Sequence, residues 1–179
     1  MQFFYVNNNI VLEFLFFLGY NKLKWQSGGV QMEKYSVALA SVVEELKLDK
    51  IYVPDNFDEI MVCKKEVNRP GLPLAGFFDH YDNERIQIMG KVEYHYLLDM
   101  TSEERKKRMM DFFEKGATAL VISSNLDVFP EVVEAAEKYS IPVLRSSDTT
   151  SNIMGSLIAS LNVSLAERMT RHGVFVECY

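Results

Sequence analysis

Short apolar runs alternate along the chain with segments of helical periodicity. The runs are three to seven residues long, rich in β-branched side chains and bounded by turn residues, which is typical of strands. They predict strands at IYV (51–53), EIMVC (59–63), IQIM (86–89), ATALVIS (117–123) and IPVL (141–144). The run at 117–123 is apolar throughout, which is the pattern of a strand buried on both faces of a sheet.

Between and after these runs, apolar residues recur every three or four positions, the spacing of one helix face. The predicted helices cover about 36–46, 101–116, 130–139 and 151–171. Ser36 is a candidate N-cap for the first, and Thr101 with Glu104 forms a capping box for the second. The apolar face of the last helix is predicted to carry Ile153, Leu157, Leu161 and Leu165. Strand, helix and strand over 117–144 form a βαβ unit with parallel strands. The fold class is therefore α/β, with a small mixed or parallel sheet flanked by helices.

The segment VNRPGLPLAGFFDHY (67–81) combines backbone punctuation with apolar bulk. Pro70 and Gly71 fit the central pair of a type II turn, in which glycine takes a positive φ. After them, Leu74, Phe77, Phe78 and Tyr81 follow the spacing of one buried helix face. Asn68 and Arg69 have no role in this turn-and-helix interpretation.

Composition narrows the possible partners. The 179 residues are 48% hydrophobic and carry a net charge of −6 with a pI near 5.1. Such a chain can bury a substantial core, and no cluster of Lys and Arg interleaved with aromatics is present, so neither nucleic acid nor a membrane is an expected partner. The cysteines Cys63 and Cys178 form no CxxC motif, and the three histidines are scattered. We expect no metal site and a cytoplasmic location.

The two ends of the chain differ from its middle. Gly28-Gly29 can be encoded by a ribosome-binding sequence a few codons before Met32, so we expect residues 1–31 to be a spurious or non-native extension. The last seven residues, GVFVECY (173–179), alternate like a strand. A terminal strand needs a partner, and without one it would form an exposed edge.

Motifs for catalysis are not found: the sequence contains no GxxxxGK[ST], GxGxxG, HExxH or GxSxG. The best candidate for binding is Arg145 with Ser146, Ser147, Asp148, Thr149 and Thr150 at a predicted strand end and helix N-terminus. Ligands collect at the carboxyl ends of strands in open α/β sheets, and a helix N-terminus attracts anions. Capping of the helix explains the same Ser and Thr residues, and Asp148 disfavours an anion.

A longer match carries more information than any short motif. VNRPGLPLAGFFDHYDNERIQIMGKVEYHYL resembles the N-terminal domain of the HPr kinase/phosphorylase family, which phosphorylates and dephosphorylates the phosphocarrier protein HPr on a serine. The resemblance continues through EER (103–105), ALVIS, IPVLRSSDTTS and HGVFVECY, and so covers about 32–179.

The resemblance implies a domain at 32–172, an α/β fold similar to the N-terminal domain of Mur-type ligases, and residues 173–179 as the first strand of a following kinase domain. In the family that second domain carries the phosphate loop, binds ATP and Mg²⁺, and contacts HPr. No catalytic residue and no cofactor is therefore expected in this chain.

The implied partners are the chain's own C-terminal kinase domain and further copies in a homo-oligomer, with HPr reached only through the kinase domain. The implied role is regulatory, in carbon catabolite control of the sugar phosphotransferase system. The alternative is a stand-alone module that senses a small anion. The candidate contacts with an anion or a neighbouring domain are Asn68, Arg69, Arg145, Ser146, Ser147, Thr149 and Thr150, with Pro70 and Gly71 as a structural turn.

Overall fold

The chain divides into two units in a computed structural model that describes residues 23–26, 29–32 and 35–166. One unit consists of residues 36–165, and the other of residues 1–35 and 166–179. In the second unit the described residues form an antiparallel pair, β1 (Leu23–Gln26) and β2 (Gly29–Met32). Most of the predicted extension at 1–31 and the predicted strand at 173–179 lie outside the described residues.

A five-stranded mixed sheet forms the centre of residues 36–165. Its strands run in the order β4 (Asp49–Tyr52), β9 (Val143–Arg145), β8 (Ala119–Ile122), β7 (Ile86–Met89) and β6 (Val67–Asn68). The strands from β6 to β9 are parallel, and β4 joins β9 in antiparallel direction. The predicted α/β class and the predicted parallel βαβ unit are confirmed.

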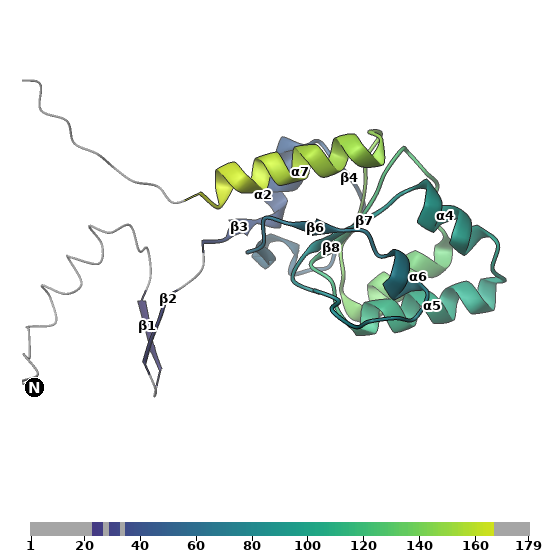
Figure 1. The fold of residues 1–179 in the computed structure, drawn as a ribbon, viewed down its shortest axis with the longest axis horizontal. Coiled ribbons are helices and arrows are strands. Elements are labelled where there is room, and N and C mark those ends of the chain that lie inside the picture. The colour runs from purple at the N-terminus through teal and green to yellow at the C-terminus, as the bar shows by residue number, and fades with distance from the viewer. Residues whose placement is uncertain (1–22, 27–28, 33–34, 167–179) are drawn as a thin grey trace, which may run out of the picture. The chain divides into compact units, whose positions relative to one another are not determined.

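Helices cover both faces of this sheet (Figure 1). The parallel strands are linked by α3 (Gly71–Leu74), by α4 (Lys91–Leu98) with α5 (Ser102–Glu114), and by α6 (Pro130–Tyr139). Because β6 to β9 advance in one direction and crossovers are right-handed, these helices fall on one face. On the opposite face lie α2 (Leu39–Glu45) and α7 (Thr150–Ser164). Two smaller strands, β3 (Val37–Ala38) and β5 (Met61–Val62), form a separate antiparallel pair near the short helix η1 (Phe57–Glu59).

The core follows the predicted pattern. All four residues of β8 are buried, as expected for a strand with helices on both faces. Met109, Phe112 and Phe113 of α5 are buried in the cluster between the sheet and α5 and α6. The predicted apolar face of the last helix is buried at all four positions, Ile153, Leu157 and Leu161 on α7 and Leu165 directly after its end.

The segment after β6 differs from its prediction. Gly71 has no positive φ and is the first residue of α3, so the predicted type II turn is wrong. The predicted helix through Tyr81 is also wrong, because α3 ends at Leu74. Gly76 takes φ +97°, and the amides of Gly76 and Phe77 donate to Pro73 O and Leu72 O. These two bonds form a Schellman motif that terminates the helix.

The first and last helices have other ends than predicted. Ser36 does not cap α2, whose N-cap is Ala38, because Val37 and Ala38 are paired with β5 as a strand. At the other end, α7 ends at Ser164 with Leu165 as its C-cap, and the predicted part at 167–171 lies outside the described residues. Among the helices that the structure describes, none has the length and apolar composition that crossing a bilayer requires.

Candidate functional site

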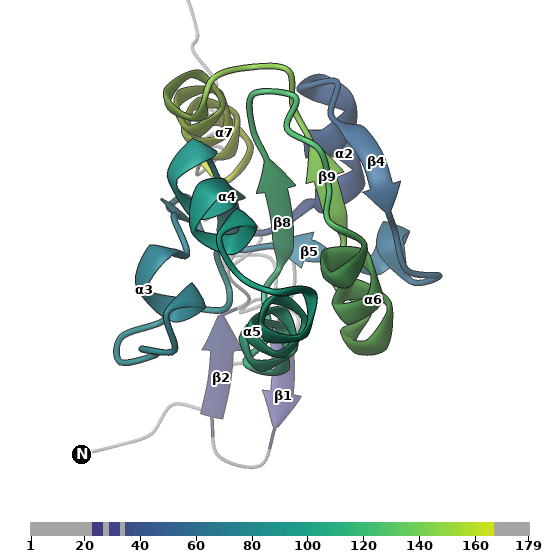
Figure 2. The ribbon, with the colours of Figure 1, turned by 90° about the vertical axis from the view of Figure 1, so that its right-hand side faces the viewer.

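The carboxyl ends of the parallel strands gather the candidate residues. In Figure 2 the arrows of β8 and β9 point toward the loops that follow these strands, and α4 and α7 lie near the same end. The residues that follow β6, β7, β8 and β9 are Arg69, Gly90, Ser123 and Ser146. In an open α/β sheet this edge is the usual location of a ligand site.

Arg69 makes an ion pair with Glu93 at this edge. Arg69 Nη2 lies 2.9 Å from Glu93 Oε2, and the Glu93 side chain is only 4% exposed, while that of Arg69 is 41% exposed. The same Oε2 accepts a hydrogen bond from the Gly90 amide at 3.0 Å. Glu93 therefore caps the start of α4 and has its charge compensated by a partly exposed guanidinium.

Thr150, the first residue of α7, packs against Gly90. A methyl group at Gly90 would overlap with Thr150 Oγ1 and lie 3.4 Å from Glu93 Oε2. Thr150 Oγ1 also shares a 2.8 Å hydrogen bond with Ser123 Oγ, and Ser123 Oγ donates to Met89 O. Gly90 thus lets α7 approach β7 closely and places Thr150 next to the Arg69–Glu93 pair.

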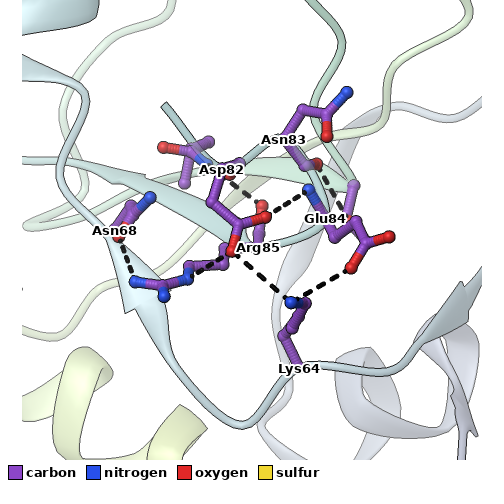
Figure 3. A network of polar contacts seen from close by, with 8 residues as sticks. Lys64, Asn68, Asp82, Asn83, Glu84 and Arg85 are labelled. Carbon is purple, nitrogen blue, oxygen red and sulfur yellow. Dashed lines mark hydrogen bonds and ion pairs between the residues drawn. The ribbon is translucent and has the colours of Figure 1, made fainter. Parts of the chain in front are cut away.

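Asn68, which lines the same pocket as Arg69, belongs to a polar network around β6 and the turn before β7, which Figure 3 shows. Arg85 donates from Nη1 to Asn68 Oδ1 at 3.1 Å and from Nε to Asp82 Oδ2 at 2.9 Å. Lys64 lies 3.7 Å from Asp82 Oδ2 and 3.2 Å from Glu84 Oε2. The hydrogen bond to Glu84 and the charge of Asp82 raise the pKa of Lys64. The network ties the edge strand β6 to the turn before β7.

Arg145 lies apart from these groups, on β9. It is directly opposite Asp49 of β4, and its Nη2 lies 3.4 Å from Asp49 Oδ2. Arg145 Nε is buried and has no hydrogen-bond partner among the described residues. Cross-strand pairing with Asp49 therefore accounts for part, though not all, of the hydrogen-bonding capacity of this guanidinium.

The polar segment after Arg145 makes mainly local bonds. Ser146 Oγ accepts from the Asp148 amide, and Thr149 Oγ1 accepts from the Asn152 amide as the N-cap of α7. Ser147 is exposed. The structure thus brings Thr150 to the Arg69–Glu93 pair, while Arg145 pairs with the antiparallel strand and Thr149 has the geometry of a helix cap.

An open pocket of about 510 Å³ lies beside Arg69, between α3 and α4. Exposed apolar side chains line it, namely Leu72, Phe77 and Val92. Its lining also includes Gln87 of β7, which is fully buried. Gln87 Nε2 donates to Asp82 O and Arg85 O, and its Oε1 has no partner among the described residues.

Sequence reasoning gave no site role to Gln87, Gly90, Glu93 or Ser123. For Gly90 and Glu93 a signal exists, since a small residue at a strand end followed three positions later by Glu is a capping-box pattern. Gln87 is recognisable as the one polar residue of the run IQIM. Within the described residues, no group of three or more His, Cys, Asp or Glu side chains could hold a metal ion.

Comparison with known proteins gives one consistent result for the sequence. The family described as HPr Serine kinase N terminus matches residues 37–161. Proteins named HPr kinase/phosphorylase from Streptococcus pyogenes serotype M5 and from Streptococcus uberis are each 38% identical to the chain over 144 residues. These matches cover 80% of the chain and 46% of each relative, so the chain spans about half the length of the curated relatives it matches.

A solved structure shows that the fold recurs elsewhere. The CBS and DRTGG domains of the regulatory region of a Clostridium perfringens pyrophosphatase, complexed with its activator diadenosine tetraphosphate, match with a TM-score of 0.50. The match covers 73% of the chain and 50% of that protein, at 15% identity, and concerns the fold alone. The family match and the 38% identity carry the assignment: the chain belongs to the HPr serine kinase N-terminal family.

Proposed function

We propose that this chain is the regulatory, non-catalytic N-terminal part of an HPr kinase/phosphorylase. The observation that carries the proposal is the identity of 38% over 144 residues to proteins of that name, within a region that is 46% of their length. In this proposal phosphoryl transfer to HPr, with ATP and Mg²⁺, is performed by a kinase domain elsewhere in the whole protein. The whole protein acts in catabolite control of the sugar phosphotransferase system.

The side chains at the strand ends support a structural and regulatory role. Arg69 is bound to Glu93, Asn68 to Arg85, and Thr150 to Ser123. Phosphoryl transfer requires a cradle for the nucleotide phosphates, ligands for Mg²⁺ and a group that orients the nucleophile. Side chains already engaged with one another in this way are suited to fixing a surface that a neighbouring domain or another copy contacts.

The stand-alone anion sensor stays a prediction with weaker support. Arg145 faces Asp49, which competes with an incoming anion, and Thr149 is engaged as the cap of α7. We therefore advance the regulatory domain as the single proposal.

A phosphorylation assay tests the non-catalytic part of this proposal. Purified chain is incubated with ATP, Mg²⁺ and HPr, and phosphoserine on HPr is measured by mass spectrometry, with the Streptococcus pyogenes relative as the positive control. We expect phosphoserine with the relative and none above the enzyme-free blank with this chain. Phosphoserine formed by this chain alone would overturn the proposal.

A further inference from the structure

The pocket between α3 and α4 contains a buried acceptor that no other group of the described structure satisfies. Gln87 is 0% exposed, and its Oε1 has no hydrogen-bond partner among the residues that the structure describes. The orientation of its amide is fixed, because Nε2 donates to both Asp82 O and Arg85 O at 3.1 Å. Exchanging the two amide atoms would place an oxygen against two carbonyl oxygens. Buried polar atoms normally have partners, and no described residue supplies one to Oε1, which leaves this acceptor to a donor that enters the pocket.

The same pocket offers the N–H donors of Arg69, whose positive charge is already compensated by Glu93. Among the described residues, Arg69 is engaged through Nη2 alone, with Glu93, and its side chain is 41% exposed. The guanidinium has five N–H donors, so most of them are available to a ligand oxygen. Asp79 also lines the pocket, so its wall carries one arginine and two carboxylates, those of Asp79 and Glu93, together with the histidine His80. A phosphate would compete with Glu93 for Arg69 and would face Asp79.

Apolar surface completes the lining. Phe77 is 51% exposed and Val92 is 71% exposed, although both line the pocket. An aromatic ring left half in water can pack against the C–H groups of a ligand, and exposed apolar surface of this kind often marks a binding site. The volume of about 510 Å³ lies within the range of about 300–1,000 Å³ that small-molecule sites occupy.

We propose that this pocket binds a neutral polyhydroxylated molecule, a sugar or a cyclic polyol. A hydroxyl group both donates and accepts hydrogen bonds, so one hydroxyl can accept from Arg69 while another donates to Gln87 Oε1. The second bond requires a small movement of the Gln87 side chain, because Oε1 has almost no exposed surface. The C–H face of the same ring packs on Phe77. The mixture of donors and acceptors, the lack of excess positive charge and the exposed ring together fit this class of ligand. The proposal does not depend on the proposed function.

Titration by isothermal calorimetry and by NMR tests the site with the full chain. The probes are glucose, maltose and myo-inositol, with glucose 6-phosphate as the charged counterpart of glucose. We expect at least one neutral probe to bind with a dissociation constant in the millimolar range or below, and the side-chain amide signal of Gln87 to shift on binding. Glucose 6-phosphate is expected to bind more weakly than glucose.

Two exposed apolar residues provide a matched pair of variants. Phe77→Ala removes the ring from the pocket and is expected to weaken binding at least fivefold. Val163→Ala changes a residue of α7 that is 77% exposed and does not line the pocket, and it should leave binding unchanged. The proposal is overturned if no neutral probe binds, if the phosphorylated probe binds more tightly, if Gln87 does not respond, or if Phe77→Ala binds as well as the unaltered chain.

Discussion

At the scale of single residues, Gly90 is where an added methyl group has the least room among the described glycines. Such a methyl group would overlap with Thr150 Oγ1, which is held by Ser123. A methyl group added at Gly71, in the same region of the fold, would have Glu93 Oε1 as its nearest neighbour, at 3.9 Å. The two glycines therefore differ in packing, although neither has a positive φ.

Gly90→Ala is expected to lower the free energy of unfolding by about 1–3 kcal/mol, because Thr150 must move and lose its bond to Ser123. Gly71→Ala should change it by less than about 0.5 kcal/mol, since the site is open and alanine favours the helix. Urea unfolding followed by circular dichroism measures both. Equal effects of the two substitutions would show that the close approach of α7 to β7 is wrong.

The Arg69–Glu93 pair makes a prediction about coupling. Arg69→Met leaves a carboxylate that is 4% exposed without its partner, and should cost about 2 kcal/mol. In the double variant Arg69→Met with Glu93→Gln the buried charge is gone, so part of that loss should be recovered. The double-mutant cycle is measured by urea unfolding. Additive effects of the two substitutions would contradict a direct ion pair.

Residue-scale features are only partly readable in the sequence. The need of a glycine for positive φ depends on where a helix ends, and periodicity extends the helix through Tyr81, whereas α3 ends at Leu74. The Pro70-Gly71 pair predicts positive φ at Gly71, but it is Gly76, at the actual end of the helix, that has it. The Arg69–Glu93 pair joins residues 24 positions apart on different elements, and no local pattern reveals such a contact.

At the scale of elements, α5 has a strong local signal at its N-terminus. Thr101 Oγ1 accepts from the Glu104 amide, and Glu104 Oε2 accepts from the Thr101 amide at 3.0 Å. The bond from the Thr101 amide, followed by that from its hydroxyl, lowers the pKa of Glu104. The sequence predicts this capping box because both partners lie within one turn of the chain.

Thr101→Ala should lower the free energy of unfolding by about 1 kcal/mol through loss of this cap. Ser36→Ala is the matched control, because Ser36 is exposed and the N-cap of α2 is Ala38. Its effect should stay below about 0.5 kcal/mol. Thermal unfolding monitored by circular dichroism gives both values, and a control as destabilised as Thr101→Ala would refute the assignment of the caps.

The contact between α5 and α6 predicts a dependence of stability on pH. Burial acts to raise the pKa of Glu131, but bonds from Ser102 and its own backbone and the charge of Arg105 outweigh it and lower the pKa. Because the pKa of Glu131 is lower in the folded state, the ionised side chain stabilises the protein at pH values above its ordinary pKa of 4.5. This contribution is lost as the pH falls through the lower, folded value.

Urea unfolding at neutral pH and at a series of acidic pH values should therefore show a smaller loss of stability in Glu131→Gln than in the unaltered chain. Ser102→Ala removes one of the bonds that lower this pKa, so it should reduce the loss in the same direction. A pH dependence identical in all three proteins would contradict the role of Glu131.

At the scale of the whole molecule, the sequence indicates the class and the order of the elements better than the contents of the site. The runs at 86–89, 117–123 and 141–144 form adjacent parallel strands because right-handed crossovers of this length leave few alternatives. The antiparallel addition of β4 could not be predicted, since its partner β9 lies far along the chain, with Asp49 paired to Arg145. The order of the strands also explains why the candidate residues do not form one site. Arg145 on β9 and Asn68 on β6 lie on strands that are not neighbours in the sheet.

The central claim, that this chain is the regulatory N-terminal part of an HPr kinase/phosphorylase, is tested most directly by exchange into a relative. Three forms of the Streptococcus pyogenes protein are compared: the whole protein, a deletion of the region that matches this chain, and a chimera carrying residues 36–165 in its place. The measured quantity is the initial rate of serine phosphorylation of HPr with ATP and Mg²⁺. The account predicts that the deletion changes this rate and that the chimera restores most of the change. A chimera that behaves like the deletion, or a deletion that behaves like the whole protein, would contradict it.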